Sequence, residues 1–250
     1  MTSSTDQVMK LIITRLSESL AAERFLPCDP PGDKLESQPG KRYPRWRNAW
    51  FAGGAGADPQ MTPTIQAHLL RSRSGSVGLS GWAWILSDAV ARVRAELPNE
   101  ALENAAESLV PSSLESVPFG HFHHPQNVGL ATIWITLESD VDYCVGRFMD
   151  SVLGPVRQWF SQRATLTDLL ALAPTPAPGS LDQSNPDSVR LRDVVIVALL
   201  RGRTEEAVSL MRWYRGRDQF DAWDSPDRVA AFDAALIDRF PDYAGARLVD

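Results

Sequence analysis

The ten residues Val77–Leu86 constrain the fold most, because they predict a strand that is apolar on both faces. Side chains alternate between the two faces of a strand. One face would carry Trp82, Trp84 and Leu86, and the other Val77, Leu79, Ala83 and Ile85. A strand of this kind must be covered on both sides, so we expect it at the centre of a sheet.

Three further segments predict neighbouring strands. Tyr43–Phe51 would place Trp46 and Trp50 on one face, and Thr64–Leu70 alternates between apolar and polar residues. Val128–Leu137 resembles the central strand in its pattern. Together these segments indicate an antiparallel meander of three to four or more strands.

Helical periodicity fills the gaps between the predicted strands and continues to the end of the chain. The predicted helices are Thr5–Phe25, Asp88–Leu97, Asn99–Val110, Asp140–Gln162 with a break at Gly154-Pro155, Thr165–Leu172, Val189–Arg201, Thr204–Tyr214 and a last helix from Ser225 to Phe240. The expected fold class is therefore α+β, with an antiparallel sheet packed with helices and an α-helical C-terminal region.

A proline-rich stretch divides the chain in this interpretation. Residues 174–187 carry Pro174, Pro176, Pro178 and Pro186 among small and polar residues, which is typical of a linker. We expect an α+β domain at residues 1–173 and a helical region at 188–250. That region would dock on the first domain, because a three-helix piece of this size is marginally stable alone.

Composition narrows the class of protein. The 250 residues are 44% hydrophobic and 22% charged, with a formal net charge of -6. The acidity argues against a non-specific nucleic-acid binder and suits a basic partner. Two distant cysteines, a polar N-terminus and the lack of any apolar run near roughly 18 residues predict a cytoplasmic protein without a membrane span.

Three of the four histidines lie in one short segment, Phe119–His124. If the segment is a strand, His121 and His123 point to the same face. Together with His124 they would then form a metal site completed by Cys144, His68 or a carboxylate. The alternative is a polar loop before Pro125 whose histidines face solvent.

The sequence shows no catalytic signature and indicates no cofactor. Gly-x-Ser-x-Gly, Cys-x-x-Cys and His-Glu-x-x-His motifs are absent. Cys144 fits a small buried hydrophobe, and Asp29 disfavours a thiolate at Cys28. Gly53–Gly56 lacks the Gly-Lys-Ser/Thr ending of a phosphate loop and is interpreted as a hairpin turn.

Two patches are candidates for partner binding. The first interleaves cations with aromatic residues: Lys41, Arg42, Arg45 and Arg47 with Tyr43, Trp46 and Trp50. It could stack bases and hold phosphates, but the overall acidity favours an edge strand protected from aggregation by its charges. The second is Trp223 between Asp221 and Asp224, either an interface anchor or a residue packed in the helical core. Four other tryptophans lie at positions whose spacing predicts that they face the core. We interpret them as packing residues: Trp82, Trp84, Trp134 and Trp159.

The order of elements resembles a known family. The run Ile133–Leu137 leads into Ser139–Asp142, a helix ending at Val152–Val156, and then Thr165–Leu170. This arrangement is similar to a bacterial family of uncharacterised α+β domains of unknown function, some of whose members lie near toxin–immunity loci. The resemblance covers roughly residues 5–175, with Val194–Tyr214 like the helical tail of some members. It implies no active-site residues.

These observations predict a non-catalytic protein that binds a macromolecular partner, such as an immunity or accessory protein. An acidic surface could then occlude a basic toxin, with electrostatic attraction speeding the encounter. Two alternatives remain open at this point. One is a metal-dependent enzyme or metal binder that uses the His121–His124 cluster, and the other is a structural homo-oligomer.

Overall fold

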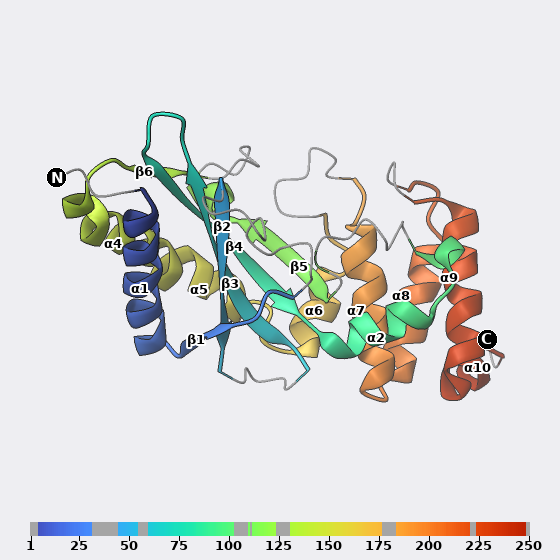
Figure 1. Ribbon diagram of the computed structural model, residues 1–250. Helices are drawn as coiled ribbons and strands as arrows, with labels where there is room; N and C mark the ends of the chain where they lie inside the picture. The colour runs from blue at the N-terminus through green and yellow to red at the C-terminus, as the bar shows by residue number, and fades with distance from the viewer. Residues whose placement is uncertain are drawn as a thin grey trace. The chain divides into compact units, whose positions relative to one another are not determined.

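The chain forms two compact units, shown in the ribbon of Figure 1. The sheet unit comprises residues 1–86 and 115–164, and the helical unit comprises residues 87–114 and 165–250. The computed structural model describes residues 5–31, 45–54, 60–102, 110, 112–123, 131–176, 184–220 and 224–248.

The sheet unit is built on an antiparallel sheet. Its strands are β1 (Phe25–Cys28), β2 (Trp46–Gly53), β3 (Thr62–Arg71), β4 (Val77–Leu86), β5 (Ser113–Pro118) and β6 (Ile133–Ile135). The order is β1-β2-β3-β4-β5, and β6 pairs separately with β4. The β4 bounds are those predicted, and the pairing of β4 with β3, β5 and β6 confirms its central place. With the helices described below, the sheet confirms the α+β fold class.

One face of the sheet forms the core of this unit. Alternation places the odd-numbered residues of β2, β3 and β4 on a single face, and most of them are buried. They are Phe51, Ile65, Ala67, Leu69, Val77, Leu79, Ala83 and Ile85. Each large aliphatic or aromatic side chain removed from water in this way contributes about 1.5–3 kcal/mol.

Two long helices accompany the sheet. α1 (Thr5–Ala22) buries an apolar stripe of Met9, Ile12, Leu16 and Leu20. It packs against α4 (Val141–Ser151) and contacts β1, β2 and β4. The short helix α3 (Phe119–His123) also lies against β4.

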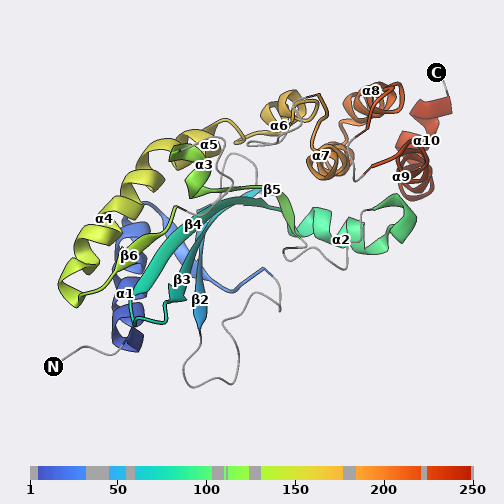
Figure 2. The ribbon, with the colours of Figure 1, turned by 90° about the horizontal axis from the view of Figure 1, so that it is seen from above.

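α4 continues without a break through a π turn (η5, Val152–Val156) into α5 (Arg157–Ser161), as Figure 2 shows. Pro155 explains the turn, because proline has no N–H to donate to the carbonyl of Ser151 four residues earlier. A π turn bonds residues five apart and so accommodates it. The break predicted at Gly154-Pro155 is therefore a local widening of one helical run.

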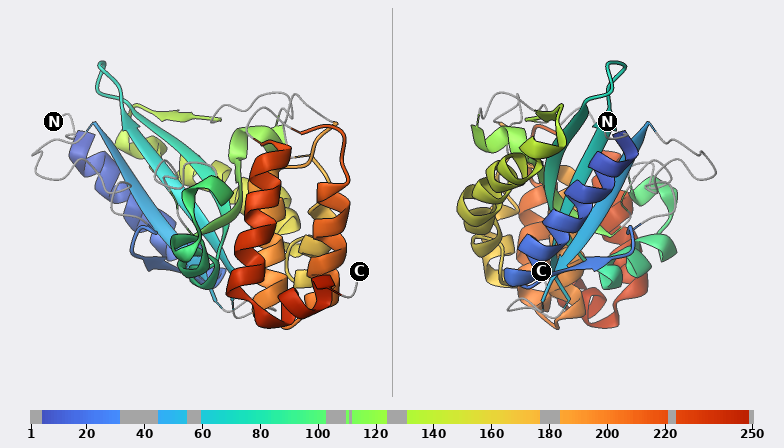
Figure 3. Two further views of the ribbon diagram at one scale, coloured as in Figure 1. Left: turned by 90° about the vertical axis from the view of Figure 1, so that its right-hand side faces the viewer. Right: turned by 60° about the vertical axis from the view of Figure 1, so that its left-hand side comes forward.

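The helical unit consists of packed helices and short turns. Its members are α2 (Asp88–Glu96), η2 (Asn99–Ala101), α6 (Leu166–Leu172), α7 (Ser188–Leu200), α8 (Thr204–Arg215), α9 (Pro226–Arg239) and α10 (Pro241–Leu248). α7 contacts α2, α6 and α8, while α8, α9 and α10 contact one another (orange to red in Figure 3). α7 is buried nearly all round, including Arg190, Arg192 and Asp193.

The two units divide the chain at other points than the predicted boundary at residue 173. Residues 87–114 and the helix α6, both expected in the first domain, belong to the helical unit. The proline-rich composition marks residues 174–187 in the sequence. Composition carries no information, however, about which compact unit a helix elsewhere in the chain belongs to. Residues 177–183 of the predicted linker lie outside the described residues.

Several elements differ from the sequence prediction. β1 and β5 were not predicted, because four and six residues are too few for a clear alternation. β6 is shorter than the predicted strand Val128–Leu137, whose first three residues lie outside the described part of the chain. Pro241 ends α9 as predicted but also starts α10, since proline is well suited to a first helical turn.

The helices of the described chain include none that is both long and apolar enough to cross a membrane.

Asp193 gives the helical unit a pH-dependent contribution to stability. Burial raises the pKa of its carboxyl group to about 7, although Arg94 and Arg192 act in the opposite direction. Folding therefore favours the protonated acid, and the resulting stability is lost as pH rises from about 4 to about 7. An asparagine side chain does not ionise, so we expect Asp193→Asn to become more stable relative to the original protein as pH rises from about 4 to about 7. Urea unfolding at several pH values measures it, and a pH-independent difference would contradict the prediction.

Candidate functional site

The second face of the sheet, opposite the core, carries most of the tryptophans of the chain. In the antiparallel register Cys28 lies opposite Trp50, Trp50 opposite Gln66, and Gln66 opposite Trp82. The parallel row Trp46, Leu70, Gly78 and Trp134 crosses the sheet nearby. Because paired residues share a face, Trp46, Trp50, Trp82, Trp84 and Trp134 define one surface, here called the tryptophan face.

Ring contacts and hydrogen bonds hold this face together. The centroids of Trp82 and Trp84 are 5.5 Å apart in a stacked arrangement, and those of Trp50 and Trp84 are 5.8 Å apart. Trp84 Nε1 donates to Gln66 Oε1 at 3.2 Å. The indoles are therefore set in fixed orientations by neighbouring strands rather than by loops.

A smaller polar group lies between the tryptophan rows. His68 Nδ1 and Asn48 Oδ1 are 2.8 Å apart, and the His68 ring lies 6.2 Å from the ring of Trp46. Burial lowers the pKa of His68, which keeps the imidazole neutral near pH 7. The pair thus offers hydrogen-bonding atoms without a charge.

Exposure on this face is graded. Trp134 is 52% exposed, Leu26 at the β1 edge is 59% exposed, and Trp46, Trp82 and Trp84 are half-buried. Trp50 is buried, and its Nε1 has no hydrogen-bond partner among the described residues. The prediction that Trp134 is a packing residue is wrong, because its indole lies over Gly78 at the surface instead of entering the core.

The face is also uncharged. Among the described residues of β1 to β4 and β6, its side chains include no Asp, Glu, Lys or Arg. Flat aromatic rings with amide and imidazole groups can stack on an uncharged ligand and hydrogen-bond to it. Within these described strand residues the surface has no cation to neutralise a phosphate.

The predicted basic-aromatic patch is divided by the fold. Arg47 lies on the face opposite Trp46 and Trp50, since it is one residue out of phase with them. β2 lies between β1 and β3, so the edge-strand interpretation is wrong. Arg45 is exposed next to β2, while Lys41, Arg42 and Tyr43 lie outside the described residues.

The histidine segment is helical rather than extended. In α3 two residues two apart point about 200° away from each other. The ring of His121 contacts Phe122, and His123 Nε2 lies 3.2 Å from Ser151 Oγ. In the described part of the chain no group of three or more His, Cys, Asp or Glu side chains could hold a metal. His124 lies outside that part.

Of the predicted anchor around Trp223, only Asp224 is described. Its carboxylate is buried in the helical unit, where Oδ1 lies 3.5 Å from Arg192 Nη1. Burial raises its pKa. Asp224 is therefore an internal ion-pair partner. Asp221 and Trp223 lie outside the described residues.

Sequence reasoning missed the tryptophan face, although its signal was present. The even-numbered phase of Trp46, Trp50, Trp82 and Trp84 places all four on one side once the registers are known. Comparison with models of protein families, with curated proteins and with solved structures finds no match to the chain. The functional argument therefore depends on this geometry alone.

Proposed function

We propose that the protein binds a protein partner, and that the tryptophan face takes an extended, uncharged segment of it. The observation that carries this proposal is the row of half-buried and exposed indoles on a surface whose described strand residues carry no charged side chain. Tryptophan is enriched among residues that dominate binding energy, because it contributes a large area at a small cost in conformational entropy.

A proline-rich segment in the polyproline II conformation fits this surface best. Such segments are extended before binding and dock on aromatic side chains. Their exposed carbonyl groups accept hydrogen bonds from donors such as indole N–H groups. Single-stranded nucleic acid fits less well, because it requires cations beside the aromatic rings.

Titration with a proline-rich peptide tests the proposal. We expect a peptide of five Ala-Pro repeats to bind with a Kd on the order of 100 μM and to shift the indole Nε1–H signals in NMR spectra. Trp134→Ala should weaken the affinity by about tenfold or more, since its exposed ring contributes to binding and not to the core. Trp213→Ala is the matched control, because Trp213 is 38% exposed on α8 of the helical unit.

The control separates the face from tryptophan content in general. Equal losses in Trp134→Ala and Trp213→Ala would contradict the proposed site. If a neutral oligosaccharide such as cellohexaose bound and the peptide did not, the ligand would be a sugar and the protein-segment proposal would fail. Concentration-dependent self-association abolished by Trp134→Ala would assign the face to a second copy of the chain instead.

A further inference from the structure

A row of three polar residues crosses the tryptophan face between its two rows of indoles. The register pairs Asn48 of β2 with His68 of β3, and His68 with Ser80 of β4. Trp46 and Trp50 lie on β2 two residues before and two residues after Asn48, on the same face. Two residues of a strand span about 7 Å. The row of Asn48, His68 and Ser80, here called the polar seam, is therefore a narrow strip with indoles on both sides.

The polar seam is accessible to a ligand at two of its three residues. Asn48 and His68 are half-buried, as are Trp46 and Trp82 in the neighbouring rows. Ser80 is only 3% exposed, and its hydroxyl donates to the His68 carbonyl at 3.5 Å. A ligand that lies along the seam therefore meets the side chains of Asn48 and His68 between aromatic rings.

The contact between these two side chains fixes the tautomer of His68. Asn48 Oδ1 can only accept a hydrogen bond, so the His68 Nδ1 that lies 2.8 Å from it carries the proton. Burial lowers the pKa of His68, and a neutral imidazole that is protonated at Nδ1 has its lone pair at Nε2. The described residues supply no hydrogen-bond partner to Nε2. The polar seam therefore presents a hydrogen-bond acceptor in a fixed position.

We propose that His68 selects the sequence of the segment bound at the tryptophan face: Nε2 accepts the backbone N–H of a non-proline residue between prolines that pack on the flanking indoles. This assignment rests on the proposed function, because it concerns the same segment. The backbone of a polyproline II segment makes no internal hydrogen bonds, so its N–H groups remain available to a partner. Proline has no N–H. A segment made only of proline would bury Nε2 without a donor, which costs binding free energy.

An amide-to-ester replacement tests whether the N–H is recognised. The probes are the peptide of five Ala-Pro repeats and its analogue in which lactate replaces each internal alanine. In the analogue an ester oxygen stands in place of each of these N–H groups, and the side chains are unchanged. We expect the analogue to bind the original protein about tenfold more weakly, because it offers no donor to Nε2. Titration followed by the indole Nε1–H signals in NMR spectra measures both affinities.

His68→Phe should abolish this preference. A phenylalanine ring keeps the flat aromatic shape but has no acceptor, so we expect the variant to bind both probes with affinities within about twofold of each other. His123→Phe is the matched control, because His123 is an exposed histidine on α3, outside the tryptophan face. The control should keep the preference of about tenfold. A preference that persists in His68→Phe would overturn the assignment.

The original protein alone supplies two further outcomes. We expect the ring nitrogen signals of His68 to show Nε2 as the unprotonated nitrogen in the free protein, and a proton at Nε2 would overturn the assignment. Equal affinity of the original protein for both probes, with Trp134→Ala weakening both, would overturn the assignment of His68 and leave the proposed function standing. If neither probe bound, the proposed function and this assignment would both fail.

Discussion

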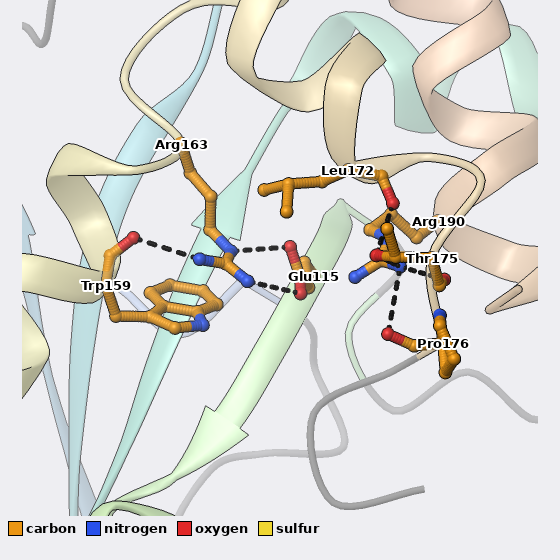
Figure 4. Close-up of polar contacts among 7 residues, drawn as sticks. All are labelled: Glu115, Trp159, Arg163, Leu172, Thr175, Pro176 and Arg190. Atoms are coloured by element: carbon orange, nitrogen blue, oxygen red, sulfur yellow. Dashed lines mark hydrogen bonds and ion pairs between the residues drawn. The ribbon is translucent and has the colours of Figure 1, made fainter. Parts of the chain in front are cut away.

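Replacing Glu115 by alanine is expected to destabilise the sheet unit by about 3–5 kcal/mol, because the change leaves the charge of Arg163 buried without its partner. The two side chains form a bidentate ion pair, with Arg163 Nε 2.7 Å and Nη2 3.0 Å from the two carboxylate oxygens (Figure 4). The exposed fractions of the side chains are 5% for Arg163 and 2% for Glu115. Urea unfolding followed by tryptophan fluorescence measures the loss.

The surroundings of Arg163 make the loss large. Its guanidinium lies 4.3 Å from the ring centroid of Trp159 and donates to the Trp159 carbonyl at 3.2 Å. These contacts orient the cation but supply no negative charge. Without Glu115 the guanidinium must stay buried and unneutralised or leave its site, and both outcomes cost free energy.

Two comparisons test whether burial is the cause. Glu206→Ala removes a partner of Arg203 in an exposed pair at the N-terminus of α8 and should cost only about 0–1 kcal/mol. The double change Glu115→Leu with Arg163→Met replaces the buried pair by apolar side chains and should cost clearly less than Glu115→Ala. A Glu115→Ala loss as small as that of Glu206→Ala would contradict the prediction.

The sequence predicted the strands and helices better than the contacts that connect them. Val77–Leu86 was predicted with its bounds because ten alternating residues carry a clear period. Alternation also separated the two faces of that strand, but it could not show which face the helices cover. The tryptophans were therefore assigned to packing, although the helix-covered face is the one that carries Leu79 and Gly81.

Buried charged side chains were the second feature that the sequence alone did not predict. Val189–Arg201 was predicted as a helix, and α7 is a helix that is buried nearly all round. Arg190, inside that helix, donates to the Thr175 carbonyl and to Thr175 Oγ1 at 3.1 Å (Figure 4). Arg94 donates to Asp193 at 3.4 Å across 99 residues of sequence. Partners at such separations leave no periodic signal, so charges inside a helix cannot be assigned to solvent or core from local pattern.

The second large effect is expected at Asp233, which joins the last three helices. Its buried carboxylate accepts a hydrogen bond from Tyr243 Oη at 2.5 Å and from Arg247 at 2.9 Å, and it also pairs with Arg215. We expect Asp233→Ala to destabilise the helical unit by about 3–5 kcal/mol, because two cations and a buried hydroxyl lose their common acceptor. Urea unfolding followed by far-UV circular dichroism measures the change.

The pH dependence distinguishes lost charge from lost packing. Burial raises the pKa of Asp233, but hydrogen bonds from Arg247 and Tyr243 and the charges of both arginines lower it by more. Because the pKa is lower in the folded state, the ionised carboxylate stabilises the fold above the unfolded pKa of about 3.9. This contribution to stability is lost as pH falls further. The stability difference between Asp233→Ala and the original protein should therefore be constant from about pH 8 to 5 and shrink below about pH 4.

Asp238→Ala is the control, because Asp238 is exposed on the same helix. Its free energy of unfolding should stay within about 0.5 kcal/mol of that of the original protein. An Asp233→Ala loss that is equally large at every pH would assign the effect to packing alone.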